Sequence, residues 1–206
     1  MGSKEERQQN RGEKKPIGKW TTEWEPGLDV ELPIKGDDIQ GFSGWASWVC
    51  FGEHHLGFDF AVYIDEKGNQ IEGLPKDTPV RAIADGTVVM VDNWDNFLED
   101  PYYNFISIRH GHNEAGPSSE YIHIISLVKM GQLVKKGEVI GKVWEAEDPE
   151  ERKEHPAPHL HLSLANGRVE TDEPLDLGEV DPVKVFPELG KIPQFIEPDD
   201  DELTVI

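Results

Sequence analysis

The sequence predicts an all-β fold built mainly from antiparallel strands, and three observations lead to this prediction. The chain of 206 residues contains 20 glycines and 15 prolines, which interrupt long helices. Short segments that alternate in polarity or are rich in β-branched residues recur along its middle part. Turn dipeptides such as Asp85-Gly86 and Asn166-Gly167 separate these segments at the short spacing of β-hairpins.

The clearest strand signals lie in five segments of this middle part. We expect strands at residues 80–84, 86–91, 104–109, 138–143 and 159–164. The segment 63–76 is expected to be a surface elaboration with a hairpin tip at residues 66–69. The resulting sheet is expected to floor a groove that is walled by loops.

Composition divides the chain into five parts. Its beginning is polar and charged, its end is a run of acidic residues, and the apolar segments lie between them. We expect a disordered head at 1–18, a segment packing on the body at 19–45, a body at 46–167, a docking segment at 168–196 and an acidic tail at 197–206.

The charge balance and the single cysteine exclude several classes of protein. Acidic residues number 41 against 20 basic ones, so the net charge is −21 and nucleic acid is not expected as a partner. Cys50 is the only cysteine, which rules out an internal disulfide and a cysteine-based zinc finger. No apolar run is long enough for a membrane-spanning helix, and the first 19 residues lack the apolar stretch of a secretory signal. The cellular compartment and the oligomeric state are left open.

The histidines are concentrated in one part of the chain, and three groups of them suggest a metal site. These groups are His55-Leu-Gly-Phe-Asp59, Tyr121-Ile-His123 and His159-Leu-His161. In an extended strand, alternate residues such as those of the third group point to one face with Cα atoms roughly 6.6 Å apart. One imidazole can then hold a metal while the other addresses a bound substrate.

A bend in the first group would complete such a site. Gly57 permits a sharp bend that brings His55 and Asp59 together. Two histidines and one aspartate give the three protein ligands of a catalytic zinc ion, with one position left for water. Such a zinc ion lowers the pKa of its bound water and polarises a carbonyl group. The chain has no His-Glu-x-x-His sequence, which excludes the metalloproteases built on that helix.

These three groups belong to a longer series of motifs along the chain. The series continues with Thr78-Pro79-Val80-Arg81-Ala82, Ile108-Arg109-His110-Gly111 and the Gly-rich segment 131–141, and it ends at Pro158-His159-Leu160-His161-Leu162. Over about residues 50–165 the chain resembles the lysostaphin-type (LytM-like) zinc metalloendopeptidases, which cut peptide cross-links in bacterial cell walls. The resemblance implies one Zn²⁺ bound by His55, Asp59 and His161, with His123 and His159 as the catalytic histidines. It also implies peptidoglycan stem or cross-bridge peptides as substrate, and a location in the cell envelope or outside the cell.

The chain departs from the family pattern at several positions. No tyrosine precedes His55, so the residue that stabilises the oxyanion in some members is unassigned. Ala157 replaces a usual glycine, and Ser163 replaces a common glutamate. The segments 59–78 and 145–155 are longer than usual and are expected to border the groove, where they would affect substrate choice.

The remaining histidines and Cys50 are expected to be structural. His54 would point away from its neighbour in a strand, and His155 lies in a charged segment and is expected to be exposed. His110 and His112 flank Gly111, where a turn would remove the same-face geometry. Cys50 follows Trp48-Val49, so we expect a buried, inert thiol.

Two alternatives to an active peptidase were weighed. A non-catalytic zinc-binding relative could regulate or bind cell-wall hydrolases, but such relatives usually lack ligands that this chain keeps. The segments 79–91 and 131–143 also resemble biotinyl or lipoyl carrier domains. Their candidate turn reads Trp94-Asp95-Asn96 and has no lysine to modify, so a carrier function is not expected.

Overall fold

Most of the chain's middle part is described by a computed structural model. The described residues are 28–49, 57–92, 101–111, 116–148, 150, 152, 155, 157–166, 178–180, 182–189 and 194–195. None of the helices in these ranges is long and apolar enough to cross a membrane.

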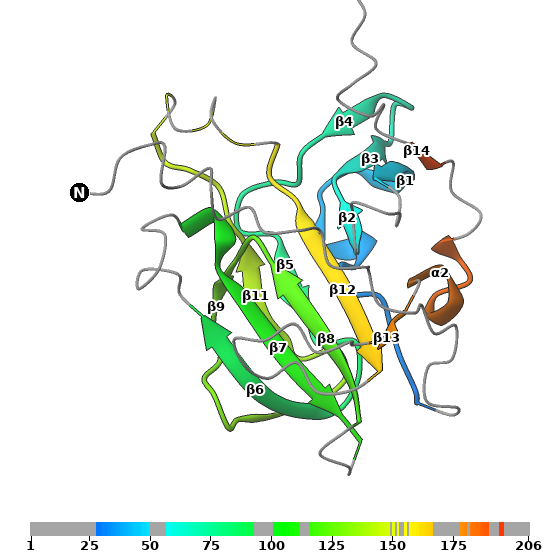
Figure 1. Ribbon diagram of the computed structural model, residues 1–206. Helices are drawn as coiled ribbons and strands as arrows, with labels where there is room; N and C mark the ends of the chain where they lie inside the picture. The colour runs from blue at the N-terminus through cyan, green and yellow to red at the C-terminus, as the bar shows by residue number, and fades with distance from the viewer. Residues whose placement is uncertain are drawn as a thin grey trace, which may run out of the picture.

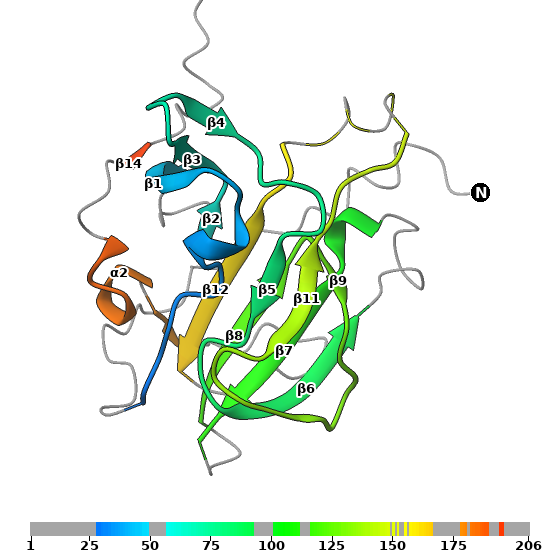
Figure 2. The same cartoon turned by 180° about the vertical axis from the view of Figure 1, so that it is seen from behind.

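Two stacked β-sheets form the centre of the fold, and a third sheet lies at one end of them (Figure 1). The large sheet has the strand order β10-β6-β7-β8-β12-β13, and β2 also pairs with β12. Its strands are β2 (Phe58–Phe60), β6 (Gly86–Asp92), β7 (Phe105–His110), β8 (Pro117–Ile122), β10 (Leu133–Val134), β12 (Leu160–Asn166) and β13 (Gly178–Glu179). The small sheet behind it has the order β5-β11-β9, with β5 (Pro79–Arg81), β9 (Ile124–Ser126) and β11 (Val139–Val143), as the reverse view shows (Figure 2).

The third sheet and three short helical segments complete the described elements. The third sheet has the order β14-β1-β3-β4, with β1 (Phe42–Val49), β3 (Val62–Asp65), β4 (Gln70–Glu72) and β14 (Gln194–Phe195). The helical segments are η1 (Gly36–Asp38), η3 (Pro101–Tyr103) and α2 (Pro182–Val185). Among the described strands, every pair is antiparallel except β1 with β14, so the predicted fold class is confirmed.

The strand predictions agree with the structure where alternation was clear. Strands β6, β7, β11 and β12 lie within two residues of their predicted bounds, and residues 66–69 form the tip between β3 and β4. The strand predicted at 80–84 ends at Arg81. The backbone N–H of Ile83 donates to the Tyr121 hydroxyl at 2.9 Å rather than to a neighbouring strand, and this explains the early end.

The two faces of the large sheet have different roles. On one face, the cross-strand row Ile106, Tyr121 and Leu162 is fully buried against the small sheet. Because side chains alternate between faces, the next row points to the opposite side. That row contains Ile122, His161 and Asp59 at directly paired positions. We call the side of the sheet that bears this row the site face.

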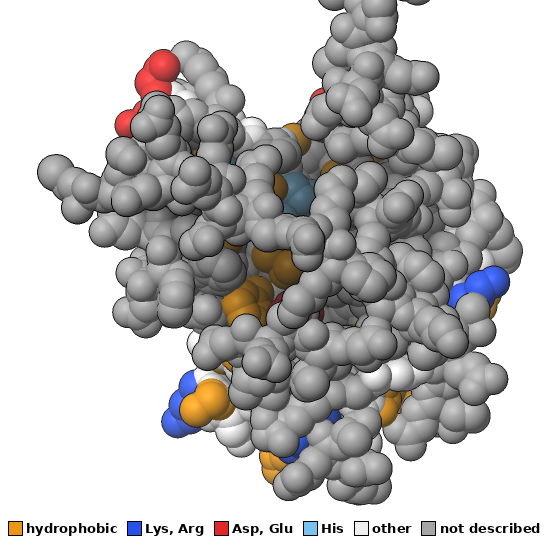
Figure 3. Space-filling view, in the orientation of Figure 1, with side chains coloured by type: hydrophobic (Ala, Val, Ile, Leu, Met, Phe, Trp, Pro, Cys, Tyr) orange, Lys and Arg blue, Asp and Glu red, His pale blue; other side chains and the backbone are white. Residues whose placement is uncertain are grey.

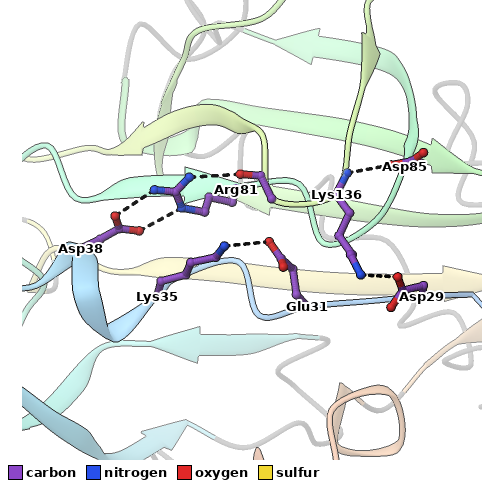
Figure 4. Close-up of polar contacts among 8 residues, drawn as sticks. Asp29, Glu31, Lys35, Asp38, Arg81, Asp85 and Lys136 are labelled. Atoms are coloured by element: carbon purple, nitrogen blue, oxygen red, sulfur yellow. Dashed lines mark hydrogen bonds and ion pairs between the residues drawn. The ribbon is translucent and has the colours of Figure 1, made fainter.

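The segment before β1 lies along β5, the edge strand of the small sheet, and is fastened there by polar contacts (Figure 4). Arg81 in β5 forms two hydrogen bonds with the Asp38 carboxylate at 2.9 and 3.0 Å. The backbone adds Glu31 N–H to Ile83 carbonyl and Arg81 N–H to Pro33 carbonyl, both at 2.9 Å. These contacts hold the segment that precedes β1 against β5.

A chain of hydrogen bonds crosses the core beneath the large sheet. The Tyr121 and Ser119 hydroxyls are 3.0 Å apart, and Ser119 Oγ is 2.8 Å from His110 Nε2. His110 Nδ1 donates to the Asp85 carbonyl at 3.0 Å, so a neutral His110 accepts at Nε2. Burial lowers the pKa of His110 and favours this neutral form. His110 is therefore a structural residue of the core, as its sequence context predicted.

We expect Tyr121→Phe to destabilise the fold by about 1 to 3 kcal/mol, because it leaves the buried Ile83 N–H without its acceptor. The measurement is the free energy of unfolding in urea. Tyr103→Phe is the matched control, since Tyr103 is 41% exposed and should change little. Equal stability of the Tyr121→Phe variant and the unaltered chain would show that this hydrogen-bond chain contributes nothing.

Candidate active site

Strand pairing places a carboxylate and an imidazole together on the site face. Asp59 in β2 is the direct register partner of His161 in β12. The His161 Nδ1 atom lies 2.8 Å from Asp59 Oδ1, although the two residues are 102 positions apart in sequence. Asp59 is buried and His161 is partly buried. Two of the three predicted zinc ligands are therefore in direct contact.

A glycine makes this contact possible through close approach. A Cβ atom added at Gly57 would lie 2.6 Å from His161 Cε1 and 2.8 Å from the Leu162 carbonyl oxygen. Such distances are shorter than van der Waals contact, so any larger residue would displace the imidazole. The sequence singled out Gly57 as a bend, whereas the structure gives its small size as the requirement.

His123 is held in an uncommon backbone conformation just after β8. Its φ of 64° lies in the left-handed region, which residues other than glycine rarely adopt. Backbone bonds fix it on both sides, from His123 N–H to the Asn104 carbonyl at 3.0 Å and from Trp144 N–H to the His123 carbonyl at 2.9 Å. Such strain is maintained only where the surroundings determine the conformation, and it is common at functional sites.

The two predicted catalytic histidines share one hydrogen-bonding arrangement. His123 Nδ1 donates to the Tyr102 carbonyl at 2.7 Å, and His159 Nδ1 donates to the Ala157 carbonyl at 2.8 Å. A carbonyl oxygen only accepts, so Nδ1 holds the proton in both rings and a neutral ring has its lone pair at Nε2. The ring centroids are 4.5 Å apart. Both neutral rings therefore have their proton acceptor at Nε2, and the two rings lie next to each other.

The surroundings of His123 also favour the uncharged form of its imidazole. Burial, with smaller effects from His159 and His161, lowers the pKa of His123 to about 3. His123 is therefore neutral at physiological pH in the metal-free protein. His159 Nε2 lies 3.9 Å from Asp59 Oδ2, which connects the histidine pair to the Asp59–His161 contact.

Ser163 occupies the position where the family commonly has glutamate, and it contacts His161. Its hydroxyl oxygen lies 2.9 Å from His161 Nε2. A hydroxyl can donate or accept, so Ser163 can partner either tautomer of the ring. Glu120 is the direct register partner of Ser163 on the neighbouring strand. Burial raises the pKa of the Glu120 carboxyl to about 7.

An aromatic stack supports the imidazole of His123. The Tyr102 ring stacks on His123 with centroids 3.9 Å apart and on His155 with centroids 4.6 Å apart. Trp144 meets the edges of both Tyr102 and His155. The prediction that His155 is exposed is wrong, because this stacking leaves it only partly exposed.

Sequence reasoning missed Tyr102 and Trp144 as residues of this site. Neither belongs to a histidine motif, and their closeness to His123 arises only from the paths of the segments before β7 and after β11. The adjacent aromatics Tyr102 and Tyr103, beside an acidic stretch, were the available signal. In the space-filling view a histidine side chain is visible in a hollow, close to hydrophobic side chains (Figure 3).

The donor set at the site face fits zinc. Carboxylate oxygen and imidazole nitrogen are common zinc ligands, and those of Asp59 and His161 converge in a partly buried place. His55, the third predicted ligand, lies outside the described residues, as do His54, His112 and Cys50. Among the residues that are described, no group of three His, Cys, Asp or Glu side chains is arranged to hold a metal ion.

Comparison with models of known protein families gives a match. The family model of Peptidase family M23 matches residues 64–174, which is more than half of the chain. The chain belongs to peptidase family M23. This confirms the resemblance inferred from the motifs. The matched stretch includes His123, His159 and His161 and begins after Asp59.

Solved structures with a similar fold include three peptidases. Lysostaphin from Staphylococcus simulans, described as an antimicrobial peptidase, is 21% identical, with a TM-score of 0.47 over 79% of this chain and 55% of that chain. A peptidase M23 from Pseudomonas aeruginosa is 21% identical, with a TM-score of 0.45 over 81% and 53%. A zinc-containing peptidase from Vibrio cholerae is 24% identical, with a TM-score of 0.42 over 71% and 41%.

This M23 chain thus spans only about half of the length of those three structures. A comparison with curated protein sequences gives no match.

We expect Gly57→Ala to weaken zinc binding by about 10- to 100-fold, because the added methyl group displaces the His161 imidazole. Zinc affinity would be measured by competition with a chromophoric chelator, and folding by circular dichroism. Gly44→Ala is the matched control, because nothing lies within 4 Å of a Cβ atom at Gly44. If the Gly57→Ala protein is folded and binds zinc like the unaltered chain, His161 is not a ligand in this geometry.

A second prediction concerns Glu120 and pH. The raised pKa means that the folded state binds a proton between pH 4.5 and about 7 that the unfolded state has already lost. Stability therefore falls as pH rises through this window, and the loss persists above it. Glu120→Gln should remove this loss and stabilise the protein at pH 8 by about 1 to 3 kcal/mol, with little effect at pH 4.5.

Thermal unfolding at both pH values measures this difference. The exposed Glu66→Gln variant is the control for a change of net charge alone. An equal shift of the melting temperature at the two pH values would argue against a proton held by Glu120 in the folded state.

Proposed function

We propose that this chain is a zinc-dependent endopeptidase that hydrolyses peptide bonds in peptidoglycan stem or cross-bridge peptides. The observation that supports this most is the convergence of the Asp59–His161 contact with two histidines that both offer Nε2 as a proton acceptor. Membership of peptidase family M23 supports the reaction class. The substrate class comes from the motif resemblance.

Asp59 and His161, together with His55, are the residues that would hold the zinc ion. When bound, the ion supplies Lewis-acid chemistry, which lowers the pKa of a water molecule and polarises the scissile carbonyl group. Ser163 would keep the His161 ring oriented through the contact at Nε2, as outer partners of metal ligands commonly do.

His123 and His159 would move the protons of the reaction. The water that attacks the carbonyl carbon loses a proton, and a neutral Nε2 atom at either histidine can accept it. The protonated imidazole can then donate this proton to the departing amine as the C–N bond breaks. The acyl product is released as a carboxylic acid, which loses its remaining proton to the other histidine or to solvent and becomes a carboxylate. The backbone carbonyls of Tyr102 and Ala157 keep both rings in the tautomer that this transfer requires.

A second candidate function is a non-catalytic relative that binds or regulates cell-wall hydrolases. As a zinc-binding relative it would keep the same ligands, so the Asp59–His161 contact is compatible with this candidate as well. The two candidates differ in whether a zinc-loaded protein cleaves peptides.

Two variants separate the candidates. His161→Ala should lose bound zinc and activity together, whereas His123→Ala should keep zinc and lose about 100-fold or more in turnover. Zinc content would be measured by mass spectrometry of the metal, and turnover by release of new amino groups from purified peptidoglycan, with and without chelator.

The outcomes are distinct for each part of the proposal. Bound zinc without cleavage of any wall peptide supports the regulator. Full turnover by His123→Ala would refute the proton-transfer role of that residue. Activity that persists after chelation and in His161→Ala would refute zinc dependence.

A further inference from the structure

A pocket opens directly beside the two histidines proposed to move protons. Its walls are the rings of Tyr102, Trp144 and His155, with Pro158 on the side of β12, and both His123 and His159 also line it. We call it the aromatic pocket. His155 ends the segment 145–155, which is longer than is usual in the family, and Trp144 directly precedes that segment.

The walls of the aromatic pocket are held rigid by contacts with one another. Tyr102 is packed between His123 and His155, with ring centroids 3.9 and 4.6 Å away. Trp144 stands edge-on to Tyr102 at 5.8 Å and to His155 at 5.3 Å. Tyr102 is only 9% exposed. A pocket that is already formed binds its ligand without the entropy cost of ordering its walls.

The charged side chains in the described lining neutralise each other. Arg152 forms an ion pair with Glu145 at 3.2 Å, and its Nε atom donates to the Ala146 carbonyl at 2.6 Å. Both groups are therefore engaged before any ligand arrives. The remaining lining consists of rings, Ala146, Ala157 and Pro158. The rings, alanines and proline suit an apolar side chain. A charged side chain would lose part of its hydration there and would find the Arg152–Glu145 pair already formed.

We propose that the aromatic pocket is a subsite for an apolar side chain of the substrate peptide, from a residue adjoining the scissile bond. This inference rests on the proposed function, because it takes His123 and His159 as the groups at the reacting carbonyl. A residue extends at most about 3.6 Å along a peptide. A pocket that shares its lining with both histidines is therefore within reach of the first residue on one side of the bond.

The subsite predicts selection against glycine at that position. A hydrophobic pocket discriminates between side chains that differ by a methylene group by about 10-fold or more in kcat/KM. A peptide with leucine or alanine at the matching position should therefore be cleaved about 10-fold faster than the same peptide with glycine. A glutamate at that position should be cleaved no faster than glycine.

The experiment uses the zinc-loaded full chain and a set of fluorogenic peptides based on pentaglycine. Each peptide replaces one glycine by L- or D-alanine, leucine or glutamate. Trp144→Ala should lower the ratio of kcat/KM for the favoured apolar peptide to kcat/KM for pentaglycine about 10-fold. Trp144→Phe, which keeps a ring, should retain most of the preference. Leu133→Ala is the control, since Leu133 is 76% exposed and does not line the pocket.

A binding measurement separates failure of the subsite from failure of the proposed function. Calorimetry with the metal-free full chain compares the apolar peptide with pentaglycine. If nothing is cleaved but the apolar peptide binds more tightly and this difference is lost in Trp144→Ala, the subsite stands and the proposed function fails. If peptides are cleaved without apolar preference, or Trp144→Ala slows all of them equally, the subsite is refuted and the proposed function stands. If neither binding nor cleavage distinguishes the peptides, the subsite is refuted.

Discussion

The pairing of β2 with β12 is the interaction on which the site depends. These strands are about a hundred residues apart in sequence, and their register sets Asp59 opposite His161 on one face of the large sheet. A shift by one residue would turn both side chains into the core, because side chains alternate between faces along a strand. The apolar neighbours Phe58, Phe60 and Leu160 resist that shift, since each is buried on the other face. Hydrophobic burial thus fixes the polar geometry of the site.

A second constraint acts on the tautomers of His123 and His159, and backbone carbonyl groups rather than carboxylates impose it. Two carbonyls, of Tyr102 and Ala157, accept from the Nδ1 atoms of His123 and His159. A carbonyl sets the tautomer as firmly as a carboxylate would, but it adds no full charge. This matters in a chain with a net charge of −21, because further carboxylates would stabilise imidazolium and remove the proton acceptors. The lowered pKa of His123 is consistent with such an environment.

The sequence predicted the parts of the fold that have a local signal. Strands β6, β7, β11 and β12 alternate or contain runs of β-branched residues, and each was placed within two residues. Strand β2 has only three residues, all of them buried, so it has no alternation to detect. Strand β8 begins with Pro117, Ser118 and Ser119, whose burial depends on neighbouring strands and not on their own polarity.

At the site, the motifs in the sequence identified the residues but did not predict the distances between their side chains. The sequence singled out His123, His159 and His161 with Asp59, and the structure brings these four together, while their roles remain proposals. His155 was misjudged because its charged neighbours in sequence are not its neighbours in space. Its ring stacks on Tyr102, a contact between two segments that no local pattern connects.

Tyr102 belongs both to the histidine pair and to the aromatic pocket, because its backbone contacts the first and its side chain lines the second. Its carbonyl orients His123, which belongs to the chemistry, while its ring walls the aromatic pocket, which in our proposal selects the substrate. The same ring also packs against the His123 imidazole, so a ligand that moves the ring moves the proton acceptor as well. Selection and catalysis would then not be independent in this chain.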